Sequence, residues 1–140
     1  MHAATSQFRD AWDGRGRVRD PHANEGERLY SLFAHLTLIA FHLGVPVAPA
    51  LIMWAIKRDG TPFVEDHARE ALNFQISLVV YSIALVPIGL VTCGVGWALY
   101  LPLYALGIVG MVLGAMAAHR GEYFRYPMCL RWVREPAPRG

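Results

Sequence analysis

The sequence lacks charged residues over two long stretches. No Asp, Glu, Lys, Arg or His occurs in residues 71–118, and residues 29–56 contain no Asp, Glu, Lys or Arg and only two histidines. A helix needs about 20 apolar residues to cross a bilayer core of roughly 30 Å, so the first stretch is long enough for two crossings and the second for one. A soluble fold would have to bury these helices, and too little other sequence remains to cover them. We therefore predict an all-α integral membrane protein with three to four hydrophobic helices.

The sequence also lacks the patterns of most enzyme and cofactor sites. Its two cysteines, Cys93 and Cys129, form no CxxC pair, and they predict no metal framework. It contains no GxSxG, P-loop or HExxH motif, each of which would have indicated a particular chemistry. The first 26 residues hold no apolar run of the kind found in a signal peptide. The net charge of +2 gives no indication of nucleic-acid binding. We predict a protein that is not an enzyme and binds no cofactor, metal or nucleic acid.

Residues that cap or break helices are expected to divide the shorter apolar stretch into two pieces. Asn24 and Glu27 have the spacing of a capping box, which predicts that a helix starts next to Asn24. This helix should end near residue 42, because Gly44 and Pro46 follow it and proline removes a backbone donor. A second apolar piece is expected over residues 47–56.

The second half of the sequence predicts a pair of long helices. Thr61 and Pro62 have the types expected at a helix cap and a first helical position. The helix that they start should continue to about residue 90. The segment TCGVG, residues 92–96, predicts a turn, and a last helix is expected over residues 97–119.

The distribution of positive charge bears on topology. Five Lys and Arg residues precede residue 29, three lie in residues 57–70, none in residues 92–96, and five follow residue 118. If the chain turns back at Gly44 and Pro46, all thirteen lie on one side of the membrane, which the positive-inside rule favours. The shortness of each arm favours a single kinked crossing instead. We expect the short hairpin, in a bacterial inner membrane with both termini in the cytoplasm, and leave the single crossing open.

One face of the helix that starts at Pro62 is polar. At 100° per residue, this face carries Asp66, Glu70, Asn73, Ser77 and Tyr81. Polar groups in lipid turn toward other helices or a cavity, because an unpartnered amide in hydrocarbon costs several kcal/mol. The face predicts either hydrogen bonds that hold the protein together, which we favour, or the lining of a substrate path.

Histidines are further candidates. His67 and Glu70 are spaced i, i+3, which can place both on one metal ion. His35 and His42 lie seven residues apart on one face of the first expected helix. Ionisable residues inside a membrane are functional candidates, so these two histidines can join Glu70 in a proton relay or a metal site. The ligands are too few for a metal site. We therefore expect the histidines to have a structural role.

Small and aromatic residues suggest contacts. Gly110 and Gly114 form a GxxxG motif that Ala118 extends, with Gly107 nearby. Small residues at this spacing let helices approach closely, and the sequence leaves open whether they do so within one chain or between copies. Aromatic residues near the expected helix ends are predicted to anchor the protein at the membrane surface: Trp54, Trp97, Tyr123, Tyr126 and Trp132.

Three segments resemble a known family. They are FVEDHAREALNFQISLVVYS at residues 63–82, GEYFRYP at residues 121–127 followed by Arg131, and AHL at residues 34–36. They resemble a bacterial membrane family of unknown function that is related to the Tic-twenty component of the chloroplast protein import machinery. The resemblance covers about residues 27–133. It implies an α-helical membrane protein of about four segments, involved in moving or assembling other proteins.

The predicted organisation has three parts. Residues 1–26 form a flexible arm, residues 27–133 a helical membrane domain, and residues 134–140 a flexible tail. We predict a non-enzymatic accessory or scaffold subunit that lies in the lipid bilayer and packs against another membrane protein or itself. The alternative is a small transporter or protein-translocation component with a polar path lined by the face that carries Glu70 and Asn73.

Overall fold

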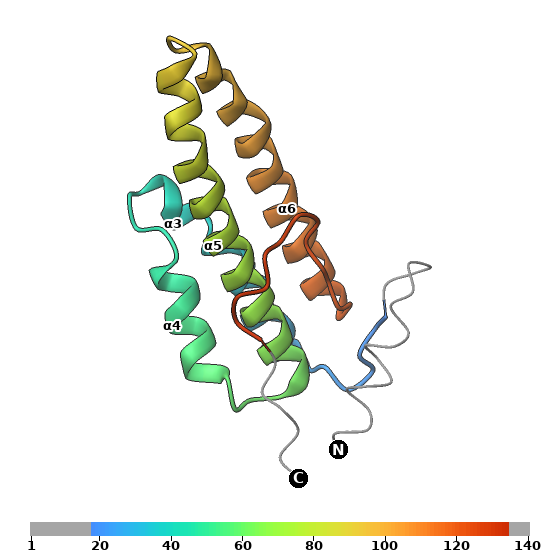
Figure 1. Cartoon of the computed structure of the whole chain (residues 1–140). Coiled ribbons are helices and arrows are strands. Elements are labelled where there is room, and N and C mark those ends of the chain that lie inside the picture. The colour runs from blue at the N-terminus through green and yellow to red at the C-terminus, as the bar shows by residue number, and fades with distance from the viewer. Residues whose placement is uncertain (1–17, 135–140) are drawn as a thin grey trace.

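The computed structural model describes residues 18–134, and this part of the chain is built from helices (Figure 1). In chain order the helices are α2 (Glu25–Leu36), α3 (Ile39–His42), α4 (Ala48–Lys57), α5 (Pro62–Val91), the short 3-10 helix η1 (Val95–Leu99) and α6 (Tyr100–Arg120). No strand occurs among the described residues, although an isolated bridge joins Arg19 to Glu122. The all-α class predicted from the sequence is confirmed over residues 18–134.

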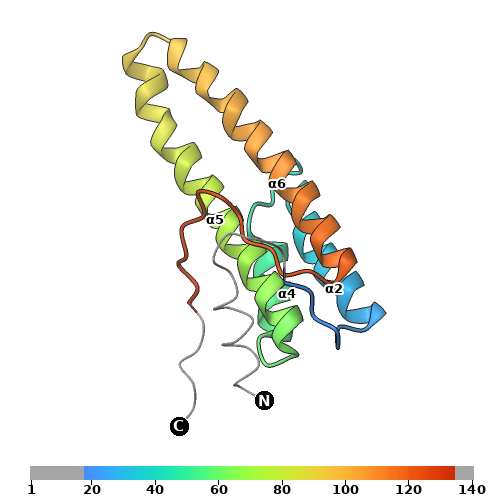
Figure 2. The same cartoon turned by 90° about the vertical axis from the view of Figure 1, so that its right-hand side faces the viewer.

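Helices α5 and α6 form a long hairpin that extends past the other helices (Figure 2). Helix α5 has 30 residues and continues through Pro87, and the chain reverses in the predicted turn before α6 begins. At this apex the Trp97 ring lies over Gly89, where an added Cβ would approach the ring to 2.6 Å. A side chain at residue 89 would therefore separate η1 from α5.

The chain before α5 turns back on itself between α3 and α4. The reversal uses Gly44 at φ +78° and Val47 at φ +66°. Helices α2 and α4 both pack against the first half of α5, where Ala34 of α2 lies in one cluster with Ala68 and Ala71 of α5. The predicted capping box is confirmed at the start of α2, since the Asn24 side chain accepts from the Glu27 amide and the Glu27 side chain accepts from the Asn24 amide.

Two of the described helical segments are long and apolar enough to cross a membrane, which is fewer than we predicted. They are α5 and the continuous segment of η1 and α6, whereas α2, α3 and α4 have 12, 4 and 10 residues. The shorter apolar stretch is divided by the Thr37 cap and by the turn at Gly44. No piece of it therefore reaches the roughly 20 residues that a crossing requires.

The two long segments are little covered by the rest of the chain. In their most apolar windows, 28% of the residues on α5 and 33% on the segment of η1 and α6 are buried. A core helix of a soluble protein would be mostly buried. Large apolar side chains of the hairpin such as Ile83, Leu90 and Leu101 are instead exposed. This surface matches the apolar interior of a bilayer.

Helix α6 ends at a glycine from which the chain crosses back over α5 (Figure 2). Gly121 has φ +73°, and the amides of Gly121 and Glu122 donate to carbonyls in the last turn of α6. A Cβ at residue 121 would also lie 3.1 Å from Nε of Arg28. Glycine is favoured here because other residues rarely adopt this conformation. We call residues 122–134 the strap.

The predicted arm and tail lie largely outside the described residues. The described end of the arm contacts the strap, since the Tyr123 amide donates to the Val18 carbonyl and the Asp20 amide donates to the Gly121 carbonyl, each at 2.8 Å. Both described ends of the chain lie in the half of the molecule away from the apex (Figure 1).

Candidate functional site

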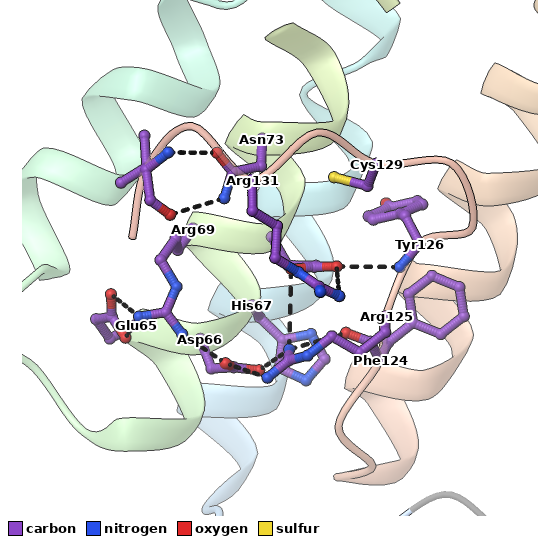
Figure 3. Close-up of polar contacts among 12 residues, drawn as sticks. Glu65, Asp66, His67, Arg69, Asn73, Phe124, Arg125, Tyr126, Cys129 and Arg131 are labelled. Atoms are coloured by element: carbon purple, nitrogen blue, oxygen red, sulfur yellow. Dashed lines mark hydrogen bonds and ion pairs between the residues drawn. The ribbon is translucent and has the colours of Figure 1, made fainter. Parts of the chain in front are cut away.

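The polar face of α5 lies under the strap (Figure 3). The Asn73 side chain donates to the Val133 carbonyl at 2.9 Å and accepts from the Val133 amide at 2.7 Å. One helical turn further along α5, the Ser77 hydroxyl accepts from the Leu130 amide at 2.8 Å. Each of these side chains therefore binds a main-chain group of the strap.

The same pattern continues at the far end of the polar face. The Tyr81 hydroxyl donates to the Met128 carbonyl at 2.6 Å. The Met128 and Trp132 side chains point away and remain 71% and 62% exposed. Asn73, Ser77 and Tyr81 of α5 thus all bond to the backbone of residues 128–133. The face on which the predicted substrate path depended is filled by the chain itself.

A buried group of charges fastens the beginning of the strap to α5 (Figure 3). Asp66 accepts from Arg125 of the strap and from Arg69 of its own helix, each at 2.8 Å. Arg69 also pairs with Glu65 at 2.9 Å. The side chains of Asp66 and Arg69 are each only 7% exposed. Removing one partner of a buried pair leaves an uncompensated charge, which typically costs about 3–5 kcal/mol.

Glu70 extends this group toward the middle of the strap. Its carboxylate accepts from the Tyr126 amide at 3.1 Å and is 3% exposed. The guanidinium groups of Arg131 and Arg125 lie 3.8 and 4.0 Å from it. The cluster of charges beside an apolar helix is therefore explained by attachment of the strap.

The strap groups titrate differently from the same groups in water. Burial lowers the pKa of Arg125, but its hydrogen bond to Asp66 and the charges of Asp66 and Glu70 outweigh burial and raise it. Burial, followed by the charge of Glu70, raises the pKa of Cys129 to about 11. Arg125 is therefore cationic and Cys129 a protonated thiol near neutral pH, so this cysteine is a poor nucleophile.

Three side chains form a continuous buried row of hydrogen bonds between α2, α5 and the strap. His35 Nδ1 lies 2.7 Å from the Tyr126 hydroxyl, and His35 Nε2 lies 2.8 Å from His67 Nδ1. His67 Nε2 lies 3.1 Å from the Glu122 carbonyl oxygen. Both imidazoles are 1% exposed or less. The row joins two points of the strap through the core.

The carbonyl at one end fixes the direction of these hydrogen bonds. A carbonyl only accepts, so His67 Nε2 carries a hydrogen, and in the neutral imidazole Nδ1 then accepts from His35 Nε2. His35 Nδ1 then accepts from the Tyr126 hydroxyl. Every polar atom in the row is satisfied with both imidazoles neutral. Burial, and next the proximity of His67, hold the pKa of His35 well below its usual range.

The described residues contain no group of three or more His, Cys, Asp or Glu side chains placed to hold a metal ion. The facing nitrogens of His35 and His67 are 2.8 Å apart. Two imidazole ligands of one zinc ion would each lie about 2.0–2.1 Å from the metal and would not touch each other. The close approach of the two rings is that of a hydrogen bond.

The small residues of α6 face the interior of the same chain. A Cβ at Gly110 would come within 2.8 Å of the Phe74 ring, and one at Gly114 within 2.7 Å of the Tyr126 hydroxyl and 2.8 Å of His35 Nδ1. Ala118 is fully buried as well. Gly107 differs, because a Cβ there would make only ordinary contacts.

The five aromatic residues expected at the membrane surface occupy different environments. Tyr123 and Tyr126 are buried, at 5% and 4% exposure, because the strap folds inward against α5. Trp54 is half-buried between α4 and α5. Trp97 lies at the apex, and Trp132 is exposed on the strap.

Sequence reasoning did not single out two residues that this site depends on. Arg125 is the cationic partner of Asp66, and the Phe74 ring stacks on Tyr126 with 3.8 Å between centroids. Arg125 lies in the segment GEYFRYP and Phe74 in FVEDHAREALNFQISLVVYS. We expected the tyrosines of GEYFRYP at the membrane surface. Only the fold brings this segment onto α5.

A family comparison bears on the whole of this arrangement. A model of the magnetosome magnetite crystal formation protein family, MamF/MmsF, matches residues 26–133. Apart from Glu25, these residues include the helices of the described part of the chain, together with the row of histidines and nearly the whole strap. The chain belongs to this family. No curated protein and no solved structure matches it.

The MamF/MmsF match corrects the resemblance to the Tic-twenty-related family, which was wrong. The residues that suggested it attach α5 to α2 and to the strap, as His67 and Asn73 do. Such residues contribute to packing within the chain and do not identify what the protein moves or assembles. The prediction of a protein-translocation role loses its support with the resemblance.

Proposed function

We propose that this MamF/MmsF protein is a non-enzymatic scaffold of the magnetosome membrane, assembled with another membrane protein or with further copies of itself. The observation that carries the proposal is the occupation of the polar face of α5 by the strap. From Asp66 to Tyr81, the side chains of this face bond to residues of the same chain. What the described chain presents outward over its long helices is apolar surface, which is suited to lipid and to other membrane helices.

The charge distribution supports an embedded hairpin with one polar end. The long apolar segments carry no charge between residues 71 and 118, and the charged residues of the described chain lie on either side of that stretch in the sequence. The fold gathers both sides at the end opposite the apex (Figure 1). A hairpin of this kind places the charged end of the protein at one face of a membrane. We propose that the family's part in magnetite crystal formation is served here by organising that membrane.

Detaching the strap tests the proposal. Asn73→Asp keeps the size of the side chain but removes the donor to the Val133 carbonyl and places a negative charge beside it. Losing one such hydrogen bond costs about 1–3 kcal/mol. We expect trypsin to cut after Arg131 of the full chain roughly tenfold faster or more. Ser82→Ala is the matched control, because the Ser82 hydroxyl donates within α5 and does not touch the strap.

The functional readout is a magnetite-forming bacterium that lacks its own family member and expresses this chain. We expect in-membrane crosslinking to join the chain to another membrane protein or to itself, and crystal size to depend on it. Asn73→Asp should weaken both effects and leave iron uptake by membrane vesicles unchanged. A chain that never crosslinks, or a variant that loses iron flux with its crosslinks intact, would contradict the scaffold proposal.

A further inference from the structure

An apolar pocket lies away from the strap, where α3 meets the α5–α6 hairpin. Its volume is about 320 Å³, and its lining comes from all three elements and the Leu38 cap, including Leu38, Phe41, Leu78, Leu103, Tyr104 and Gly107. This volume is at the lower end of the range of small-ligand pockets, which is roughly 300–1,000 Å³.

Hydroxyl groups in the wall of the pocket are bonded within the protein. The Ser82 hydroxyl donates to the Leu78 carbonyl at 2.7 Å, and the Tyr100 hydroxyl donates to the Ser82 carbonyl at 2.5 Å. The rest of the lining is mainly carbon. An occupant gains from filling the space with carbon atoms rather than from hydrogen bonds to these groups.

The position of the pocket selects what can reach it. Leu78 lies seven residues into the uncharged stretch that begins at Ala71 and thirteen residues before the end of α5 at Val91. At 1.5 Å per residue these distances are roughly 10 and 20 Å. In a bilayer with a core of about 30 Å, the pocket therefore opens among acyl chains. A helix about 10 Å wide does not fit into it, whereas a flexible chain does.

We propose that this pocket binds one acyl chain of a membrane phospholipid. The binding does not rest on the hydrophobic effect, because the surrounding lipid is equally apolar. It rests on dispersion contacts, because an unfilled pocket leaves the lining atoms without neighbours on one side. The proposal goes beyond the scaffold function and rests on its membrane location, since the ligand is a component of the bilayer.

Gly107 offers a way to fill the pocket without disturbing the core. An added Cβ would lie 3.5 Å from Leu78 and 3.7 Å from Leu38, which are ordinary contacts. Gly107→Ala should therefore leave the pocket open, and Gly107→Leu should occupy it. Val112→Leu on the same helix places a leucine at an exposed position that does not line the pocket.

The test uses the full chain in phosphatidylglycerol nanodiscs that contain a phosphatidylcholine with a diazirine near the middle of one acyl chain. After irradiation, crosslinked residues are mapped by mass spectrometry. We expect Leu103 and Tyr104 to be labelled more strongly than Leu113, which is exposed elsewhere on α6. Gly107→Leu should reduce the labelling of Leu103 and Tyr104 about tenfold, because an acyl chain would no longer bind preferentially in the pocket. Gly107→Ala and Val112→Leu should retain the strong labelling.

The other outcomes separate the two proposals. The acyl-chain site would be overturned if Leu103 and Tyr104 were labelled no more strongly than Leu113, and if Gly107→Leu, in a folded protein, left their labelling unchanged. This result would leave the membrane location intact. Weaker labelling of Leu103 and Tyr104 than of Leu113 in the unmutated chain would overturn the acyl-chain site too, because a side chain of another protein would then fill the pocket. No labelling anywhere on α5 and α6 would contradict the membrane location itself.

Discussion

At the scale of single residues, the row from Tyr126 through His35 to His67 imposes a protonation state. The carbonyl of Glu122 accepts at one end, so each imidazole has one nitrogen that must accept. A second hydrogen on His35 would point at the Tyr126 hydroxyl, which already donates to that nitrogen. The hydroxyl would have to turn and lose its acceptor in a buried site, which costs free energy.

The free energy of unfolding should therefore fall in mild acid. In the unfolded chain the pKa of His35 is about 6.5, and in the folded chain burial and His67 lower it well below that value. The unfolded state thus binds more protons below about pH 6.5, so stability is lost as the pH falls, by at most about 1.4 kcal/mol per pH unit for one histidine. Thermal unfolding in detergent at a series of pH values measures this.

Two variants isolate the histidine responsible. His35→Asn should reduce the dependence of the unfolding temperature on pH. His119→Asn, at an exposed position in the last turn of α6, should not change it. An equally steep pH dependence in His35→Asn would mean that another group causes it.

At the scale of the helices, glycines in α6 set how closely the strap and α2 approach. Gly114 makes room for both His35 and Tyr126, and these two residues come from different segments. A methyl group there must displace one of them, because the space is filled by ring atoms rather than by a flexible chain end. Tight contact between small residues and aromatic rings replaces the helix-to-helix contact between copies that a GxxxG motif also allows.

Gly114→Ala should lower the free energy of unfolding by about 1–3 kcal/mol, the usual cost of overpacking a core. Gly107→Ala, which meets only ordinary contacts, should change it little. Unfolding by a denaturing detergent, followed by circular dichroism, compares the two variants. A Gly114→Ala protein as stable as Gly107→Ala would show that His35 and Tyr126 make room for a methyl group at little cost.

At the scale of the whole molecule, the fold predicts the orientation of the chain. The apex carries Cys93, which is exposed, and the opposite end carries the exposed Arg58. Since α5 joins these two ends, they should lie on opposite sides of the membrane. In a Cys129→Ser chain, a membrane-impermeant maleimide should label Cys93 from one side of sealed vesicles. Arg58→Cys, in a chain with both native cysteines replaced by serine, should be labelled from the other side. Labelling of both from the same side would contradict a spanning hairpin.

Much of the fold follows from local patterns. The capping residues, the two helix-breaking turns and the long uncharged stretch predict elements close to α2, α4, α5 and α6, because each depends on neighbouring residues. The polar face of α5 could also be predicted from the sequence, since its five residues recur at helical spacing. Its partners were not, because Arg125 and Val133 lie 59 and 60 residues away from Asp66 and Asn73.

The sequence by itself determined where the helices run, which face of α5 is polar and where charge ends and apolar surface begins. Only the tertiary structure decided that the strap covers that face, that the histidines share hydrogen bonds with Tyr126, and that the shorter apolar stretch is divided into pieces below crossing length. The reason is physical. Helix propensity and periodicity act over a few residues, whereas the pairing of buried polar groups depends on which distant segment satisfies them, and that is settled when the whole chain packs.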